Sequence, residues 1–320
     1  MTDIPQTALQ KLCHTLQLSE AAIQALNIDP NSPFPLKVPA EFLAQIQPNQ
    51  PNDPLLQQIL PLKIEHQTAE GFNQDPVSDL TFNPVPSLIH KYHGRVLLIA
   101  SPKCDIHCRY CFRRHFPYSE QTNTRHWQKA LDYIAQDNSI HEVILSGGDP
   151  MSLSEKSLVH LIQQVEDIPH IQTLRIHSRT PVATPKKAPI QELLTWAKHS
   201  RLNKVLVIHC NHANELSSQT ASLFSQYKTA GFHLLNQSVL LKGVNDRTDV
   251  LETLSHALFK QGVLPYYLNQ LDRVEGAAHF EVDKKIALQL HSQLRVLLPG
   301  YLLPKLVKDT QGYAYKTPLN

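Results

Sequence analysis

Apolar runs alternate with amphipathic stretches along this 320-residue chain from Arg95 onward. The alternation predicts strands at 95–100, 141–146, 171–177, 203–209, 232–238 and 264–268. It predicts helices at 124–136, 153–166, 189–198, 214–229, 248–261 and 282–297. The strands recur at intervals of roughly 30 residues, the length of one βα unit, so a parallel sheet is expected. A partial (β/α)6 barrel and an open doubly wound sheet both fit this spacing.

Polar motifs lie at the end of each predicted strand, and their number separates the two architectures. They are the cysteine-rich loop at 101–118 and residues 146–150, 177–181, 209–215, 236–238 and 271–273. In a barrel all strand ends open onto one face, where catalytic groups gather. An open sheet uses only the ends near its switch point. Six motifs after six strands therefore favour an α/β fold of the partial (β/α)6 barrel type.

Three cysteines, Cys104, Cys108 and Cys111, lie close together after the first of these strands. A structural zinc site needs four ligands, so one loop with three thiols does not complete it. Three thiolates can instead hold three irons of a cubane cluster and leave the fourth iron open to another ligand. The spacing Cys-x3-Cys-x2-Cys resembles the pattern of the radical S-adenosylmethionine enzymes, which bind a [4Fe-4S] cluster in this way.

Composition excludes several classes of protein. The chain is 42% hydrophobic and 18% charged with a formal charge of +2, so neither disorder nor a polyanion-binding surface is indicated. It contains no apolar run of about 18 residues, and its first residues lack the pattern of a signal peptide. Five cysteines with three clustered favour metal binding in a reducing compartment over a disulfide framework. We expect a cytoplasmic protein that binds neither nucleic acid nor membrane.

The chain divides into three segments by texture. Residues 1–93 are rich in Pro, Gln and Asn and predict short helices at 8–16, 20–26, 39–46 and 52–59, with Asp53 as a cap. Residues 94–300 carry the barrel pattern. Residues 301–320 predict a strand followed by a loop that contains Lys316. The first segment should wrap around or dock onto the barrel.

Several polar residues allow both a structural and a functional interpretation. Gly147, Gly148 and Asp149 could form only a capped turn, or they could let the backbone approach a ligand. Arg179 could be structural or could bind an anion. The pair His209 and His212 could suit a metal, although no further ligand completes the set. Cys13 and Cys210 are expected to be packed thiols, apart from the cluster.

Lys316 lies four residues before the last residue of the sequence, where a lysine is usually only solvated. Its setting in a Gly-containing loop after an apolar strand is less ordinary. Attack of such a lysine on a carbonyl cofactor is a chemistry that would explain it.

Taken together, the motifs resemble the lysine 2,3-aminomutase family. The resemblance covers about residues 90–318 and is carried by residues 104–114, 146–149, 178–181, 236–241, 265–267 and 316–318. Residues 90–93, 108–118, 209–215 and 275–280 are most similar to the short branch that works with elongation factor P. That branch supplies (R)-β-lysine, which a partner lysyl ligase attaches to a lysine of the translation factor.

The resemblance implies three cofactors: a [4Fe-4S] cluster, S-adenosyl-L-methionine and pyridoxal 5′-phosphate (PLP). Cys104, Cys108 and Cys111 would hold the cluster, and Lys316 would be the catalytic lysine that bonds to PLP. The S-adenosylmethionine contacts would come from Ser146, Gly147, Gly148, Asp149 and Gln237.

The resemblance also implies the substrate, L-lysine, and how it is held. Arg113 would bind its carboxylate, and Asp272 and Asp309 would bind its far ammonium group. A hydrated ammonium enters a buried site only where carboxylates replace its water. The implied activity is conversion of L-α-lysine to (R)-β-lysine through a 5′-deoxyadenosyl radical, which requires an external electron donor.

Two other classes of protein remain open from the residues alone. One is a radical S-adenosylmethionine enzyme that modifies a macromolecule without PLP. The other is a non-catalytic metal-binding or partner-docking module.

Overall fold

Nine strands form one sheet whose order, β1 to β9, follows the chain without a reversal in the described residues. The computed structural model describes residues 7–121 and 124–319. The strands are β1 Leu88–Tyr92, β2 Arg95–Ser101, β3 Glu142–Gly147, β4 Thr173–Ser178, β5 Asn203–Ile208, β6 Phe232–Leu240, β7 Leu264–Gln270, β8 Lys305–Lys308 and β9 Thr317–Pro318. Strands β2 to β8 are parallel, whereas β1 and β9 pair antiparallel at the two edges. A doubly wound sheet would reverse its strand order, so the partial barrel is confirmed.

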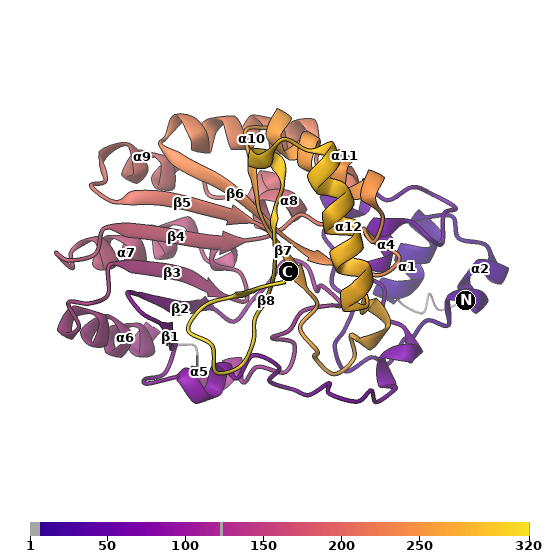
Figure 1. Ribbon diagram of the computed structural model, residues 1–320, viewed down its shortest axis with the longest axis horizontal. Helices are drawn as coiled ribbons and strands as arrows, with labels where there is room; N and C mark the ends of the chain where they lie inside the picture. The colour runs from indigo at the N-terminus through magenta and orange to yellow at the C-terminus, as the bar shows by residue number, and fades with distance from the viewer. Residues whose placement is uncertain (1–6, 122–123, 320) are drawn as a thin grey trace, which may run out of the picture.

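The six predicted strands correspond to β2–β7, and each is followed by a helical segment on the outside of the sheet (Figure 1). These helices are α5 Tyr118–Gln121, α6 Thr124–Gln136, α7 Glu155–Glu166, α8 Thr180–Ala183, α9 Gln191–His199, α10 Ser218–Thr229, α11 Thr248–Lys260 and α12 Lys284–Leu297. The largest apolar cluster lies between β2–β6 and the helices packed on them. Alternate strand residues such as Leu98, Leu145 and Leu174 are fully buried in it.

Helix starts differ from the predicted ones where a cap intervenes. The helix expected at 214–229 begins only at Ser218, because the Ser217 side chain accepts from the Thr220 N–H in a capping box. Residues 213–215 form a separate short 3-10 turn, η5. The helix expected at 153–166 likewise begins after Ser154, which caps α7.

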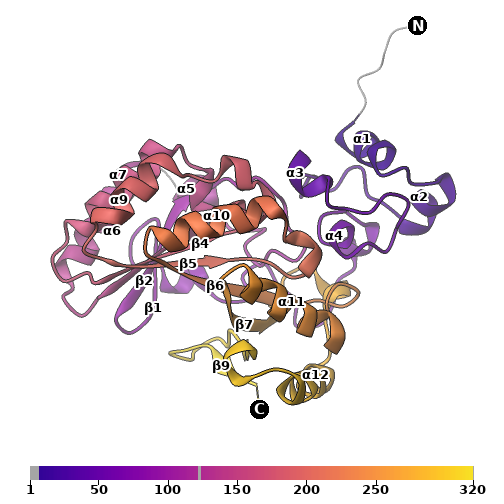
Figure 2. The ribbon, with the colours of Figure 1, turned by 90° about the horizontal axis from the view of Figure 1, so that it is seen from above.

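The N-terminal residues form a group of short helices beside the barrel (Figure 2). They are α1 Ala8–Thr15, α2 Glu20–Leu26, α3 Ala40–Leu43 and α4 Pro54–Gln57, of which the last begins at the predicted cap, Asp53. Their apolar side chains form one cluster that includes Cys13, Ile106 and Ala183. Ile106 lies between two of the clustered cysteines, so this group of helices packs directly on the cysteine loop.

Short 3-10 turns complete the chain. They are η1 Lys63–His66, η2 Asp79–Phe82, η3 Pro150–Ser152, η4 Pro185–Lys187, η5 Ala213–Glu215, η6 Ala278–Phe280 and η7 Gly300–Leu302. None of the described helices is both long enough and apolar enough to cross a membrane.

Candidate active site

A cavity of about 490 Å³ opens at the carboxyl ends of the parallel strands. Its walls include Cys104, Gly148, His177, Gln237, Asp272 and Lys316, which come from six different stretches of the chain. The polar motifs that follow the strands therefore meet at one place, as the barrel arrangement predicts.

Cys104, Cys108 and Cys111 all line this cavity and are half-buried. All five cysteines of the chain are free thiols. Burial, and then the neighbouring Cys108, raise the pKa of Cys111 to about 11. Burial also raises the pKa of Cys104. Bound metal supplies the positive charge that converts cysteine side chains to thiolates, which fits the donor set of an iron–sulfur cluster.

The three cysteines do not converge on one point. In the described part of the chain, no group of three or more His, Cys, Asp or Glu side chains is close enough to hold a single metal ion. A cubane does not require such convergence, because each cysteine binds a different iron. His209 and His212 also have separate partners: His209 Nε2 lies 3.0 Å from Gln237 Nε2, and His212 Nδ1 accepts from the Asn214 N–H.

The two glycines after β3 let that loop pass very close to the cysteine loop. A Cβ on Gly147 would lie 2.7 Å from the Ser101 carbonyl oxygen, and one on Gly148 would lie 2.5 Å from the Lys103 oxygen. Gly147 also has φ +120°, which a side chain disfavours. The Gly148 and Asp149 N–H groups donate to these carbonyls at 2.7 Å. The glycines therefore allow approach to the cysteine loop, and these two N–H groups are already used within the protein.

The side chain of Asp149 connects the loops that follow β3 and β4. Its buried carboxylate accepts from Ser178 Oγ at 2.6 Å and from the N–H groups of Met151, Arg179 and Thr180 at 2.8–3.0 Å. Burial raises the pKa of Asp149 despite these bonds. The residue lines the cavity, but the hydrogen bonds of its carboxylate serve the loops after β3 and β4.

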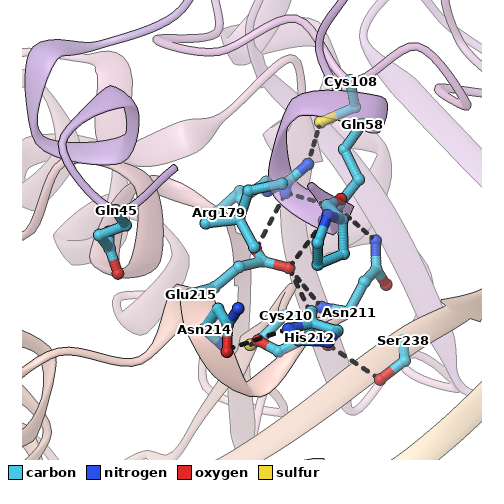
Figure 3. A network of polar contacts seen from close by, with 12 residues as sticks. Gln45, Gln58, Cys108, Arg179, Cys210, Asn211, His212, Asn214, Glu215 and Ser238 are labelled. Atoms are coloured by element: carbon cyan, nitrogen blue, oxygen red, sulfur yellow. Dashed lines mark hydrogen bonds and ion pairs between the residues drawn. The ribbon is translucent and has the colours of Figure 1, made fainter. Parts of the chain in front are cut away.

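Arg179 lies at the centre of a buried polar network (Figure 3). Its Nη2 forms an ion pair with Glu215 at 2.9 Å and donates to Gln58 Oε1 at 2.8 Å. Its Nη1 donates to Cys108 Sγ at 2.7 Å and to the Tyr110 hydroxyl at 2.6 Å. These partners leave little of the guanidinium for an external anion, so the structural interpretation of Arg179 is the one the geometry supports.

Glu215 completes this network from the loop after β5. It is fully buried and accepts from Gln58 Nε2 at 3.1 Å and from the N–H groups of Asn211 and His212 at 2.9 and 3.0 Å. The pair with Arg179 thus joins helix α4, the cysteine loop and the ends of β4 and β5.

Arg113 lines the cavity, and part of its guanidinium is already held. Its Nε donates to Asp79 at 2.7 Å and its Nη1 to Ser146 Oγ at 3.2 Å. Asp79 also pairs with Lys91 at 2.6 Å. Burial raises the pKa of Asp79, but Arg113 and Lys91 outweigh burial and hold that pKa below its usual value.

Lys316 and two acids, Asp272 and Asp309, also line the cavity. Lys316 Nζ lies 3.4 Å from Asp309 Oδ2, and Asp309 also accepts from the Tyr92 hydroxyl at 3.3 Å. The described contacts give the Asp272 carboxylate no hydrogen bond. Burial raises its pKa to about 6, although Lys316 opposes this effect. Asp272 is half-buried, and such an acid without a hydrogen-bond partner is suited to receive a cation from a ligand.

Six further residues line the cavity that the sequence did not identify as site residues, namely Asp79, Lys91, Tyr92, Arg95, Arg175 and Tyr267. Arg95 stacks on the Tyr92 ring at 4.7 Å and has no ion pair in the described part of the chain. Arg175 pairs with Glu142 at 2.6 Å, and Lys91 pairs with Asp79. The three cations still outnumber these two acids, and beside a reactive lysine they suit a ligand that carries a phosphate and a carbonyl group. This donor set fits PLP. The stretch His90-Lys-Tyr-His93 contributes to the family resemblance, and its Lys91 is the sequence signal that could have indicated a binding site for an anionic group.

Comparisons with known proteins show which proteins this chain is similar to. The profile of the family described as "4Fe-4S single cluster domain" matches residues 93–199. An L-lysine 2,3-aminomutase of Haemophilus influenzae is 46% identical over 285 residues, which are 89% of this chain and 84% of that protein. That of Escherichia coli is also 46% identical, over 90% of this chain and 84% of its own length. That of Clostridium subterminale is 37% identical over 87% of this chain and 67% of its own.

The buried network predicts that Glu215→Gln destabilises the protein. The exchange leaves Arg179 buried without its counter-charge, which typically costs about 3 kcal/mol in free energy of unfolding. Urea unfolding of the cluster-free protein would measure the loss. Glu120→Gln, at an exposed position of α5, should change stability by less than about 0.5 kcal/mol. Equal stability of the two variants would contradict the assigned role of Glu215.

The raised pKa of Asp272 predicts a substitution that stabilises the protein. Its folded pKa of about 6 lies above the ordinary 3.8, so ionised Asp272 disfavours the folded state above pH 6. Asp272→Asn should therefore raise the free energy of unfolding by about 2 kcal/mol at pH 7.5.

This gain should shrink as the pH falls through 6 and be almost lost near pH 4, close to the ordinary pKa of 3.8 that the group has in the unfolded chain. Denaturant unfolding at pH 7.5 and pH 4 tests the prediction, with the exposed Asp132→Asn as control. A loss of stability at pH 7.5, or a gain that does not depend on pH, would contradict it.

Proposed function

The chain belongs to the L-lysine 2,3-aminomutase family, and we propose that it converts L-α-lysine to (R)-β-lysine in the cavity described above. The observation that carries the proposal is that Cys104, Cys108 and Cys111 line the same cavity as Lys316, from which they are separated by more than 200 residues of sequence. The enzyme is a radical S-adenosylmethionine isomerase. Its cofactors are a [4Fe-4S] cluster, S-adenosylmethionine and PLP.

When bound, the cluster and S-adenosylmethionine supply a carbon-centred radical, and PLP supplies an imine through which the amino group moves. The three cysteines hold the cluster. We assign the cavity surface of residues 146–149 and the amide of Gln237 to S-adenosylmethionine. Burial lowers the pKa of the neighbouring His209 to about 3, so its ring is neutral beside the cationic sulfonium ligand.

Lys316 is assigned to the covalent attachment of PLP, and the cations of Lys91, Arg95 and Arg175 to its phosphate. Asp309 lies 3.4 Å from Lys316 Nζ and steadies its ammonium group before attachment. The Tyr92 hydroxyl donates to Asp309 and fixes this carboxylate from β1, at the other edge of the sheet.

The substrate is assigned a position between Arg113 and the two acids. Arg113 is oriented by Asp79 and Ser146 and would bind the lysine carboxylate. Asp272, whose carboxylate has no partner in the described contacts, would bind the far ammonium together with Asp309. A side chain that ends in an uncharged group would leave Asp272 buried and unpaired, which favours lysine over apolar amino acids.

The proposal extends to the use of the product and to the compartment. The similarity of residues 90–93, 108–118, 209–215 and 275–280 to the branch linked with elongation factor P supports a role in supplying β-lysine to the lysyl ligase of that factor. Free thiols and a clustered cysteine set support a cytoplasmic location, where reducing conditions persist. The reaction also requires an external electron donor.

Lys316→Ala tests the proposal. The wild-type protein treated with PLP and borohydride should retain one PLP on the peptide that contains Lys316, and Lys305→Ala, on β8, should behave the same way. Lys316→Ala should retain none. Under nitrogen with lysine, S-adenosylmethionine and a reductant, it should form β-lysine at least about a thousandfold more slowly than wild type. Covalent PLP on Lys316→Ala, or no β-lysine from the loaded wild type, would contradict the assignment.

The same variant tests the link to elongation factor P. Cells whose own copy is replaced by Lys316→Ala should make elongation factor P without the mass of a β-lysyl group, and added (R)-β-lysine should restore it. An unchanged mass of the factor in those cells would refute the link and leave the aminomutase activity untouched.

A further inference from the structure

Four exposed lysines lie on or near the loop that carries Cys104: Lys37, Lys103, Lys186 and Lys187. Lys37 Nζ donates to the Cys104 carbonyl oxygen. Lys187 Nζ lies 3.5 Å from Asp105 Oδ1, and its side chain is 66% exposed. Lys103 directly precedes Cys104 in the chain. These four residues are called the cationic surface below.

The cationic surface is built from three separate parts of the fold. Lys37 comes from the segment before α3, Lys103 from the cysteine loop, and Lys186 and Lys187 from η4. The N–H of Lys186 lies 3.5 Å from Glu41 Oε2 of α3, which places η4 against the N-terminal helices. The loop of Cys104 is therefore covered by lysines that converge from distant positions in the sequence.

Positive charge is in excess here. Four lysines face two nearby carboxylates, Asp105 and Glu41, while the entire chain carries a formal charge of only +2. Beside them His107 stacks on Phe34 at 4.6 Å between ring centroids, and its N–H donates to the Lys37 carbonyl. Both rings are partly exposed. Arg109 and Arg114 also lie over the Phe34 ring at 4.8 Å, so what this surface offers a partner is mainly positive charge, which is suited to a small, transient and charge-guided contact.

The cationic surface lies next to Cys104, and this position indicates what a partner bound there would do. Cys104 lines the cavity, while its own carbonyl is held by Lys37 from the outer side. A protein seated on the cationic surface would thus contact the same loop that carries Cys104. The lysines have no role in holding substrate, because none of them lines the cavity.

We propose that the cationic surface docks a small acidic one-electron carrier protein that reduces the cluster. This inference rests on the proposed function, which requires an external electron for each cleavage of S-adenosylmethionine. One electron leaves the reduced carrier, which is oxidised by one electron, and converts the cluster from its 2+ to its 1+ state. No bond or proton changes place in this step. Opposite charges raise the rate of encounter and favour this approach over others.

The test measures reduction of the cluster alone, without lysine or S-adenosylmethionine. The double variant Lys186→Glu/Lys187→Glu reverses two charges at residues that do not line the cavity. Reduced flavodoxin, an acidic flavoprotein, serves as the carrier, and stopped-flow bleaching of the cluster absorbance reports the rate. At low ionic strength the second-order rate constant should be at least about tenfold lower for the variant than for wild type. The difference should shrink in roughly 0.5 M salt, which screens the charges strongly.

Two controls separate docking from other effects. Photoreduced 5-deazariboflavin, which is uncharged, should reduce variant and wild type equally. Lys129→Glu/Lys198→Glu makes the same charge change on α6 and α9 and should leave the rate with flavodoxin within about twofold of wild type. Because the readout omits substrate, a failure to form β-lysine would count against the proposed function and leave this result unaffected.

Three results would overturn the proposal. One is an unchanged rate with flavodoxin in Lys186→Glu/Lys187→Glu. Another is an equal fall in the α6/α9 control variant, which would show a general charge effect. The third is an equal fall with 5-deazariboflavin or a loss of cluster loading, either of which would show that these lysines act on the cluster site itself.

Discussion

The ion pair between Arg179 and Glu215 is the interaction on which the arrangement of the site depends. A buried charge without its partner is strongly unfavourable, so the two side chains must remain together once their surroundings exclude water. Their other hydrogen bonds reach Gln58 of the N-terminal helices, Tyr110 and Cys108. The pair therefore fixes the cysteine loop to three elements at once. Ile106, buried among the N-terminal helices, adds an apolar attachment at the same loop.

The two halves of the site come from opposite edges of an open sheet. The cysteines follow β2, whereas Lys316 precedes β9, and a closed barrel would bring such edges together by strand pairing. Here a side-chain contact spans the opening, since Tyr92 of β1 donates to Asp309 after β8. Hydrogen-bonded strands thus form one wall of the cavity, and contacts between polar side chains hold the other.

The sequence predicted the parallel strands well, because apolar periodicity and βα spacing are local properties. It also located the cysteines and Lys316, whose residue types and settings are unusual. It missed Asp79 and Lys91, which lie in a stretch without clear periodicity, and Arg95, the first residue of a predicted strand, because only the fold brings these three side chains to the cavity. From the sequence, the glycines after β3 were expected to form a capped turn or to let the backbone approach a ligand. In the structure they allow close approach to the cysteine loop, a contact over more than 40 residues of sequence that no local pattern encodes.

The central claim is that one cavity holds the source of the radical and the lysine substrate together. Lysine deuterated at its β-carbon tests this claim most directly, with deuterium followed by mass spectrometry during anaerobic turnover. We expect deuterium to enter the 5′-carbon of S-adenosylmethionine and to appear in β-lysine. Cleavage of S-adenosylmethionine in the presence of lysine, with no deuterium in the adenosyl group, would contradict the account.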